Sequence, residues 1–196
     1  MLSLLDSPGR RLSGEKNALN GPVGREHIMQ DNFKKKNQDI ASYEYFQKVA
    51  APANINPRTL LATDYLNHFN EVIMLIDMIA DMPDCAEDIF AWKPKTYQEH
   101  FRDSSFSSKD LAIAAYEYTP LCYREPLERL IGQLNGLILQ VVSRLREAAS
   151  ANDGADIAAV ALFGPELRLL VERAGGIING EAEGHDQAEI DAVLRS

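Results

Sequence analysis

The residues with the clearest chemical potential are one histidine and two carboxylates in a predicted helix. Asp64, His68 and Glu71 are separated by four and three residues, so all three side chains lie on one helix face. An imidazole between carboxylates can bind a transition metal, take part in acid–base catalysis, or be held by hydrogen bonds inside a core. Glu99 and His100, in the sequence Tyr-Gln-Glu-His-Phe, are candidates for further ligands from a second helix.

The spacing favours a structural role for this histidine. Helical bundles that bind metals through carboxylates and histidines usually place Glu three residues before His, in two copies, whereas Glu71 follows His68 and does so once. We interpret His68 as a packed side chain that Asp64 or Glu71 orients by a hydrogen bond. A bundle that binds a metal through Asp64, His68, Glu71 and His100 is the alternative.

These residues belong to the segment with the clearest helical pattern, Pro57–Met82. Apolar or ring-bearing residues recur along it at alternating spacings of four and three, with a second apolar row beside the first. Two adjacent rows form a face broad enough to pack against helices on two sides. The segment is therefore the predicted central helix of a bundle, with Asn56 as its N-cap and Pro83 just after its end.

A second long helix is predicted over Tyr123–Ala149, where apolar residues have the same spacing. After a polar break, the apolar period continues toward residue 180 across Gly164 and Pro165, where we expect a kink or a restart. Residues 122–180 thus predict an antiparallel helical hairpin that packs on the central helix. Between residues 84 and 120 we expect short helices whose aromatic side chains close one end of the bundle, or form a ligand or partner surface.

Composition limits the classes of function. The 196 residues include 45% hydrophobic residues, and the net charge of -9 disfavours a phosphate-binding surface, so we expect no nucleic-acid partner. The two cysteines form no CxxC pair, which suits a reducing cytoplasm. Neither a membrane-spanning segment nor a secretory signal is indicated. The sequence also has no Gly-rich phosphate loop, nucleophile elbow or catalytic Cys/His spacing, so we expect no enzyme and no cofactor.

We predict an all-α, cytoplasmic protein in three parts. Residues 1–36 have many Gly, Pro and polar residues without an apolar period, which indicates disorder. Residues 37–180 form the helical bundle domain, which begins with a short helix over 37–50. Residues 181–196 form a flexible linker and a short docking helix.

The docking helix is predicted from the last eleven residues, DQAEIDAVLRS. Asp186 and Glu189 resemble a capping box, and both carboxylates favour a helix N-terminus. Ile190, Val193 and Leu194 form an apolar stripe. A helix this short is marginally stable alone in water, so we expect it to fold on a partner.

This segment resembles the docking peptide of flagellar motor switch proteins, which binds the phosphorylated chemotaxis response regulator. It is also similar to the C-terminal tail of the chemotaxis response-regulator phosphatase. The matching residues are Gln187, Glu189, Ile190, Asp191, Ala192 and Leu194. Val193 replaces a usual leucine, Arg195 adds a positive charge, and the switch peptide lies at the opposite chain end. A chance acidic amphipathic helix is the alternative.

The resemblance implies that Gln187, Glu189, Ile190, Asp191, Val193 and Leu194 contact a response regulator. Phosphatases of that kind also need an acidic residue and an amide on a helix. Asp64 with Asn67, or Glu128 with Gln133, supplies these residue types. Neither pair reproduces the full motif, so we expect a non-enzymatic adaptor in chemotaxis or two-component signalling.

Overall fold

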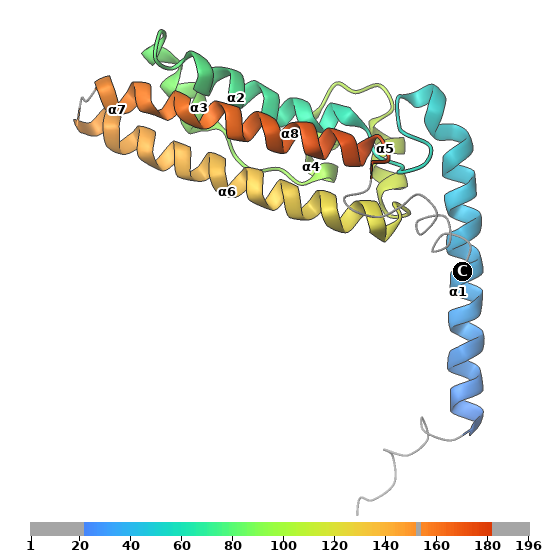
Figure 1. Ribbon diagram of the computed structural model, residues 1–196. Helices are drawn as coiled ribbons and strands as arrows, with labels where there is room; N and C mark the ends of the chain where they lie inside the picture. Colours follow the sequence, from blue (N-terminus) through green and yellow to red (C-terminus); the bar gives the residue numbers. More distant parts are fainter. Residues whose placement is uncertain (1–21, 152–153, 182–196) are drawn as a thin grey trace, which may run out of the picture. The chain divides into compact units, whose positions relative to one another are not determined.

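The computed structural model describes residues 22–151 and 154–181 (Figure 1). Every regular element among these residues is an α-helix or a 3-10 helix, which confirms the predicted all-α fold. The chain divides into two compact units, residues 1–41 and 42–196. The predicted docking helix, residues 186–196, lies outside the described residues.

Helix α1, Pro22–Ala50, extends from the first unit into the second. The sequence predicted disorder over residues 1–36, but residues 22–36 are helical, and residues 1–21 lie outside the described part. The helix has almost no amphipathic character. For this reason the spacing of apolar residues could not predict it. Its Arg, Glu, Met, Gln and Lys residues instead have good intrinsic helix propensity, and proline is favourable at its first position.

The predicted central helix is wrong at its N-terminal end. The 3-10 helix η1, Ala51–Ala53, is followed by a tight turn, and the 3-10 helix η2, Thr63–Leu66, leads into helix α2, Asn67–Met78. Asn56 caps the turn rather than a helix, because its Oδ1 accepts hydrogen bonds from the backbone N–H groups of Arg58 (2.9 Å) and Thr59 (3.2 Å). Leu60 takes a left-handed conformation with φ of 59°, which a continuing α-helix does not allow.

The core of the second unit is built by α2, α6 and α8. Helix α6, Leu121–Ala151, is continuous, as predicted. Helix α7, Gly154–Ala159, and the 3-10 helix η4, Val160–Phe163, precede helix α8, Gly164–Ile178, so the predicted restart at Gly164 is confirmed. Helices α6 and α8 form the predicted antiparallel hairpin, and α8 also packs on α2 (Figure 1).

Gly164 allows the close approach of α2 and α8. A Cβ atom at this position would collide with the carboxylate of Asp77 on α2. The same carboxylate forms an ion pair with Arg168, one turn further along α8. The glycine therefore makes room for a polar contact between the two helices.

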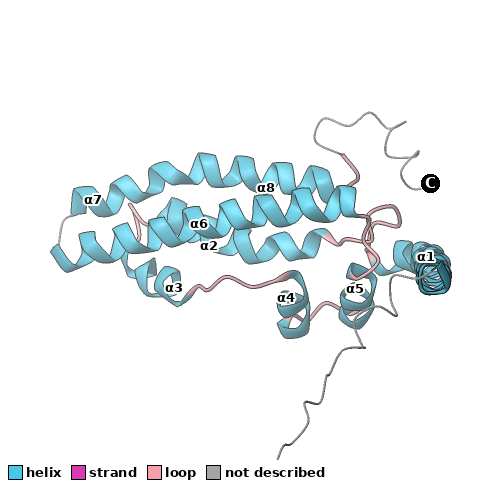
Figure 2. Cartoon of the chain, turned by 90° about the horizontal axis from the view of Figure 1, so that it is seen from below, coloured by secondary structure: helices cyan, strands magenta, loops and turns pink. Residues whose placement is uncertain are grey.

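Three short helices follow one another along the bundle (Figure 2). The 3-10 helix η3, Pro83–Cys85, leads into α3, Ala86–Ala91, and α4, Tyr97–Asp103, and α5, Lys109–Tyr116, follow. Short helices were predicted between residues 84 and 120, and all three lie in this range. Their aromatic side chains pack on the core, as in the stacked rings of Tyr97 and Tyr116 at 4.7 Å.

Among the described residues, no helix combines the length and apolar character that crossing a membrane requires.

Candidate functional site

The structure brings the sequence-predicted site residues together around one polar cleft. Asp64, His68 and Glu71 line it from η2 and α2, and His100 lines it from α4. The cleft has a volume of about 570 Å³. We name it the histidine cleft, and its other lining residues are Asn67, Lys95, Asp103, Ser104, Ser105, Phe106 and Ser107.

His68 is held mainly by aromatic packing. Its ring stacks on Trp92 with 5.1 Å between the ring centroids and 22° between the planes. Trp92 Nε1 donates a hydrogen bond of 3.1 Å to the backbone carbonyl of His68. Phe69 packs edge-on against the same ring. The single tryptophan therefore fixes both the side chain and the backbone of His68.

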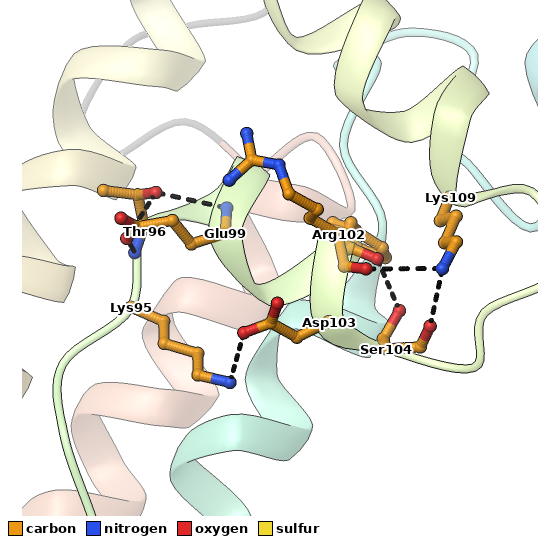
Figure 3. A network of polar contacts seen from close by, with 8 residues as sticks. Lys95, Thr96, Glu99, Arg102, Asp103, Ser104 and Lys109 are labelled. Carbon is orange, nitrogen blue, oxygen red and sulfur yellow. Dashed lines mark hydrogen bonds and ion pairs between the residues drawn. The ribbon is translucent and has the colours of Figure 1, made fainter.

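Side-chain contacts of Lys95, Thr96 and Glu99 fix the first turn of helix α4, which carries His100 (Figure 3 shows these three residues). Thr96 and Glu99 form a capping box, in which each side chain accepts a hydrogen bond from the backbone N–H of the other residue. Lys95 forms an ion pair of 2.8 Å with Asp103, which lies two turns further along the chain. These contacts set the position of His100, whose ring centroid lies 6.1 Å from that of His68.

Lys109 fixes the other end of α4 (Figure 3). Its ammonium group donates hydrogen bonds of 3.3 Å to the backbone carbonyls of Arg102 and Ser104. Cations near a helix C-terminus interact favourably with the carbonyls that have no partner within the helix. Both ends of α4 are thus tied by side chains of neighbouring segments.

Both histidines of the cleft are neutral at neutral pH. Burial, and to a smaller extent the neighbouring His100, lowers the pKa of His68 to about 4. The pKa of His100 is also lowered, first by burial and then by Lys95, although the charges of Glu71 and Asp64 oppose this shift. Two neutral imidazoles beside carboxylates can accept hydrogen bonds or act as ligands.

Among the described residues, the expected hydrogen bond from the ring of His68 to the carboxylate of Asp64 or Glu71 is not found. The side chain instead has a hydrogen bond with the backbone of Lys93. Its Nε2 is buried and has no partner among the described residues. Stacking on Trp92 turns the ring toward the α3–α4 segment, so the spacing on α2 alone could not predict its partner.

The candidate metal ligands share the cleft but do not converge. In residues 22–151 and 154–181, no three His, Cys, Asp or Glu side chains are grouped closely enough to hold a metal ion. The four candidates Asp64, His68, Glu71 and His100 therefore do not form a coordination site in this structure. Of the two acid–amide pairs, Asp64 and Asn67 both line the histidine cleft.

A second cleft was missed by sequence reasoning. It has a volume of about 430 Å³ and lies between the segment 94–99 and α6. Glu128, Gly132 and Asn135 line it from α6, at spacings of four and three residues that place them on one helix face. We name it the tyrosine cleft because Tyr65, Tyr97 and Tyr116 also line it. The spacing of the α6 residues could be read from the sequence, but the sequence did not show that the segment 94–99 lies opposite them.

Comparison of the chain with protein-family models, curated proteins and solved structures finds no match.

Proposed function

We propose that this chain is a non-enzymatic adaptor whose C-terminal segment docks on a response regulator, while the bundle binds a second protein. The observation that supports the proposal is the acidic and apolar pattern of residues 186–196. Ile190 and Leu194 are four residues apart and Val193 lies beside them, so one helix face can enter a groove. Glu189 and Asp191 can pair with basic residues at the rim of that groove on the partner.

The described end of the bundle suits a separate docking segment. Helix α8 ends in a Schellman motif, in which Gly180 has φ of 97° and the N–H of Glu181 donates to the carbonyl of Gly176 (2.8 Å). The carbonyl of Ile178 accepts a hydrogen bond from the hydroxyl of buried Thr59 (2.7 Å). These contacts stop α8 and anchor its end before Glu181.

Apolar burial dominates the expected binding energy. Burying one aliphatic side chain contributes roughly 1.5–3 kcal/mol, whereas an exposed ion pair contributes about 1 kcal/mol or less. Ile190 and Leu194 should therefore carry most of the affinity. Glu189 and Asp191 should mainly affect the association rate and its salt dependence.

The test is titration of the full chain and of its Ile190→Ala/Leu194→Ala variant against phosphorylated and unphosphorylated response regulators from the source cell. We expect the double variant to lose affinity by about 100-fold or more, with an unchanged melting temperature. A matched control is Leu162→Ala/Leu169→Ala, which removes two leucines that are 80% and 54% exposed on the bundle. This control should bind as the unmodified chain does.

Two results would contradict the proposal. Equal binding by the chain and its tail variant, or binding by neither, would remove the docking role. A lower melting temperature of the tail variant would mean that residues 186–196 pack on their own bundle.

A further inference from the structure

The tyrosine cleft has apolar walls that come from three separate segments. Tyr65 lies in η2, Tyr97 begins α4, and Leu127 and Ile131 lie on α6, and all four side chains are buried. Tyr65 donates a hydrogen bond of 2.8 Å from its hydroxyl to the carbonyl of Lys95. This bond ties the 94–99 segment to η2, so the cleft walls are held in place without a ligand.

Gly132 leaves a gap in the α6 side of this cleft. Among the described residues, a Cβ atom at Gly132 would meet no atom within 4 Å apart from its chain neighbours and the nearby backbone of its own helix, and the residue lines the cleft. Glycine inside a helix costs roughly 1 kcal/mol relative to alanine. No packing contact explains this glycine, because a larger side chain would extend into open space.

Hydrogen-bond acceptors lie on both sides of the gap. Glu128, one turn before Gly132, accepts a hydrogen bond of 2.8 Å from the hydroxyl of Tyr116 through Oε1. Asn135, one turn after Gly132, has a buried Oδ1 without a partner among the described residues. A buried acceptor without a partner costs free energy unless a donor satisfies it. A molecule in this cleft would therefore bring hydrogen-bond donors.

The charges around the cleft favour a cation. Glu128 contributes a carboxylate, and the carboxylate of Glu99 at the rim already accepts hydrogen bonds in the capping box. Lys95 is the lining residue with a positive charge, and its ammonium group is paired with Asp103 at 2.8 Å. The acceptors and the remaining negative charge thus complement an ammonium group.

We propose that the tyrosine cleft binds a small aromatic amine, with its ring in the gap at Gly132 and its ammonium group on the carboxylate of Glu128. The ring contacts Leu127, Ile131 and the tyrosine side chains, which suits an apolar ligand. The ammonium group donates to the carboxylate of Glu128, which can accept further hydrogen bonds beside the one from Tyr116. This site is independent of the C-terminal docking segment, so either proposal can fail without the other.

The test uses 2-phenylethylammonium as the probe and 3-phenylpropionate as its counterpart with the opposite charge. Both are titrated into the full chain by calorimetry and by NMR. We expect saturable binding of the amine, at least about tenfold weaker binding of the carboxylate, and shifted tyrosine signals. Saturable binding of the carboxylate with equal affinity, or no saturable binding of the amine, overturns the proposal.

Variants of α6 separate this site from surface binding. Gly132→Leu fills the gap and should abolish binding of the amine. Gly136→Leu is the matched control, because Gly136 is one turn further along, also has open space at its Cβ, and does not line the cleft. Glu128→Gln keeps an acceptor for Tyr116 but removes the charge, and should weaken binding about tenfold.

The variants can also overturn the proposed binding site. Equal loss in Gly132→Leu and Gly136→Leu, or full binding in Gly132→Leu, places the probe elsewhere and overturns the proposal. Binding that appears only after residues 182–196 are removed would mean that the chain's own tail occupies the cleft, which also overturns it.

Discussion

The two segments that supply much of the bundle core, residues 55–79 and α6, are held in place by different interactions. In α6 the backbone groups pair within one helix, and the buried side chains are mostly apolar. In residues 55–62 the side chains of Leu60 and Leu61 are fully buried, but the backbone is not helical. Its polar groups therefore need partners from elsewhere, because a buried group without one is costly.

Those partners come partly from within the segment and partly from distant parts of the chain. The N–H of Ala62 donates to the hydroxyl of Tyr97 (2.9 Å), and the N–H of Leu61 donates to the hydroxyl of Thr59 (3.3 Å). Thr59 in turn donates to the carbonyl of Ile178 at the end of α8 (2.7 Å). The non-helical segment thus connects α4 and α8, a connection that a longer regular helix would not make.

The largest expected effect tests the apolar packing of α6. Leu134→Ala on α6 should lower the free energy of unfolding by about 2–5 kcal/mol, because the side chain is 0% exposed and its removal leaves a cavity. Leu139→Ala is the control on the same helix, since Leu139 is 47% exposed. Urea unfolding measures both. Equal losses would show that α6 is not packed as described.

The same contrast explains which parts of the fold were predictable. The 4-3 spacing alone located α6, since its stability depends on one apolar face. The same spacing failed at residues 57–62, where Asn56 forms a local turn and Tyr97 satisfies a backbone group from 35 residues away. Spacing cannot reveal such a contact, because it records only which side chains share a face.

A smaller loss of stability is expected from Thr59→Val, which tests the hydrogen bonds that hold residues 55–62. Valine keeps the shape of this fully buried residue but leaves the N–H of Leu61 and the carbonyl of Ile178 unpaired. The expected cost is about 1–3 kcal/mol in the free energy of unfolding. Thr63→Val makes the same change at an exposed position, and should alter stability by less than about 0.5 kcal/mol.

If both threonine variants have the stability of the unmodified chain, the hydroxyl of Thr59 does not support the segment. Hydrogen exchange gives a second measure. In Thr59→Val, the amide of Leu61 should exchange faster, while amides in the middle of α6 keep their protection relative to the new global stability.

The pH dependence of stability distinguishes α2 from α6, which contains no histidine. Burial lowers the pKa of His68 from its ordinary 6.5 to about 4. Between these values the unfolded chain binds this proton and the folded chain does not, so the contribution of His68 is complete above pH 6.5 and is lost as the pH falls toward 4. Because the ring is only partly buried, the loss should be about 1–2 kcal/mol.

His68→Phe isolates this contribution, because phenylalanine can still stack on Trp92 but cannot titrate. As the pH falls from 6.5 to 4.5, the unmodified chain should lose free energy of unfolding relative to the His68→Phe variant. The difference between the two should stay constant between pH 7 and pH 8. A difference that does not change below pH 6.5 would mean that folding leaves the pKa of His68 unaltered.

The candidate site was predictable in the same limited way. Asp64, His68 and Glu71 share a helix face by spacing, and His100 does lie across the cleft from them. Trp92 and the backbone of Lys93 were not predictable as the partners of His68, because a short helix and a loop bring them there. The tyrosine cleft was missed for a related reason, since one of its sides is the irregular segment around Pro94.

The smallest expected effect is a gain in stability within α6. Gly136 lies inside the helix, is exposed, and has open space where a Cβ atom would be, so Gly136→Ala should stabilise the chain by about 0.5–1 kcal/mol through helix propensity. Gly164→Ala should have the opposite sign, because its Cβ atom would meet the carboxylate of Asp77 between α2 and α8. Thermal unfolding of both variants measures the two signs together. A loss in Gly136→Ala would show that another part of the chain lies against this face of α6, since only a close contact could outweigh the gain in helix propensity.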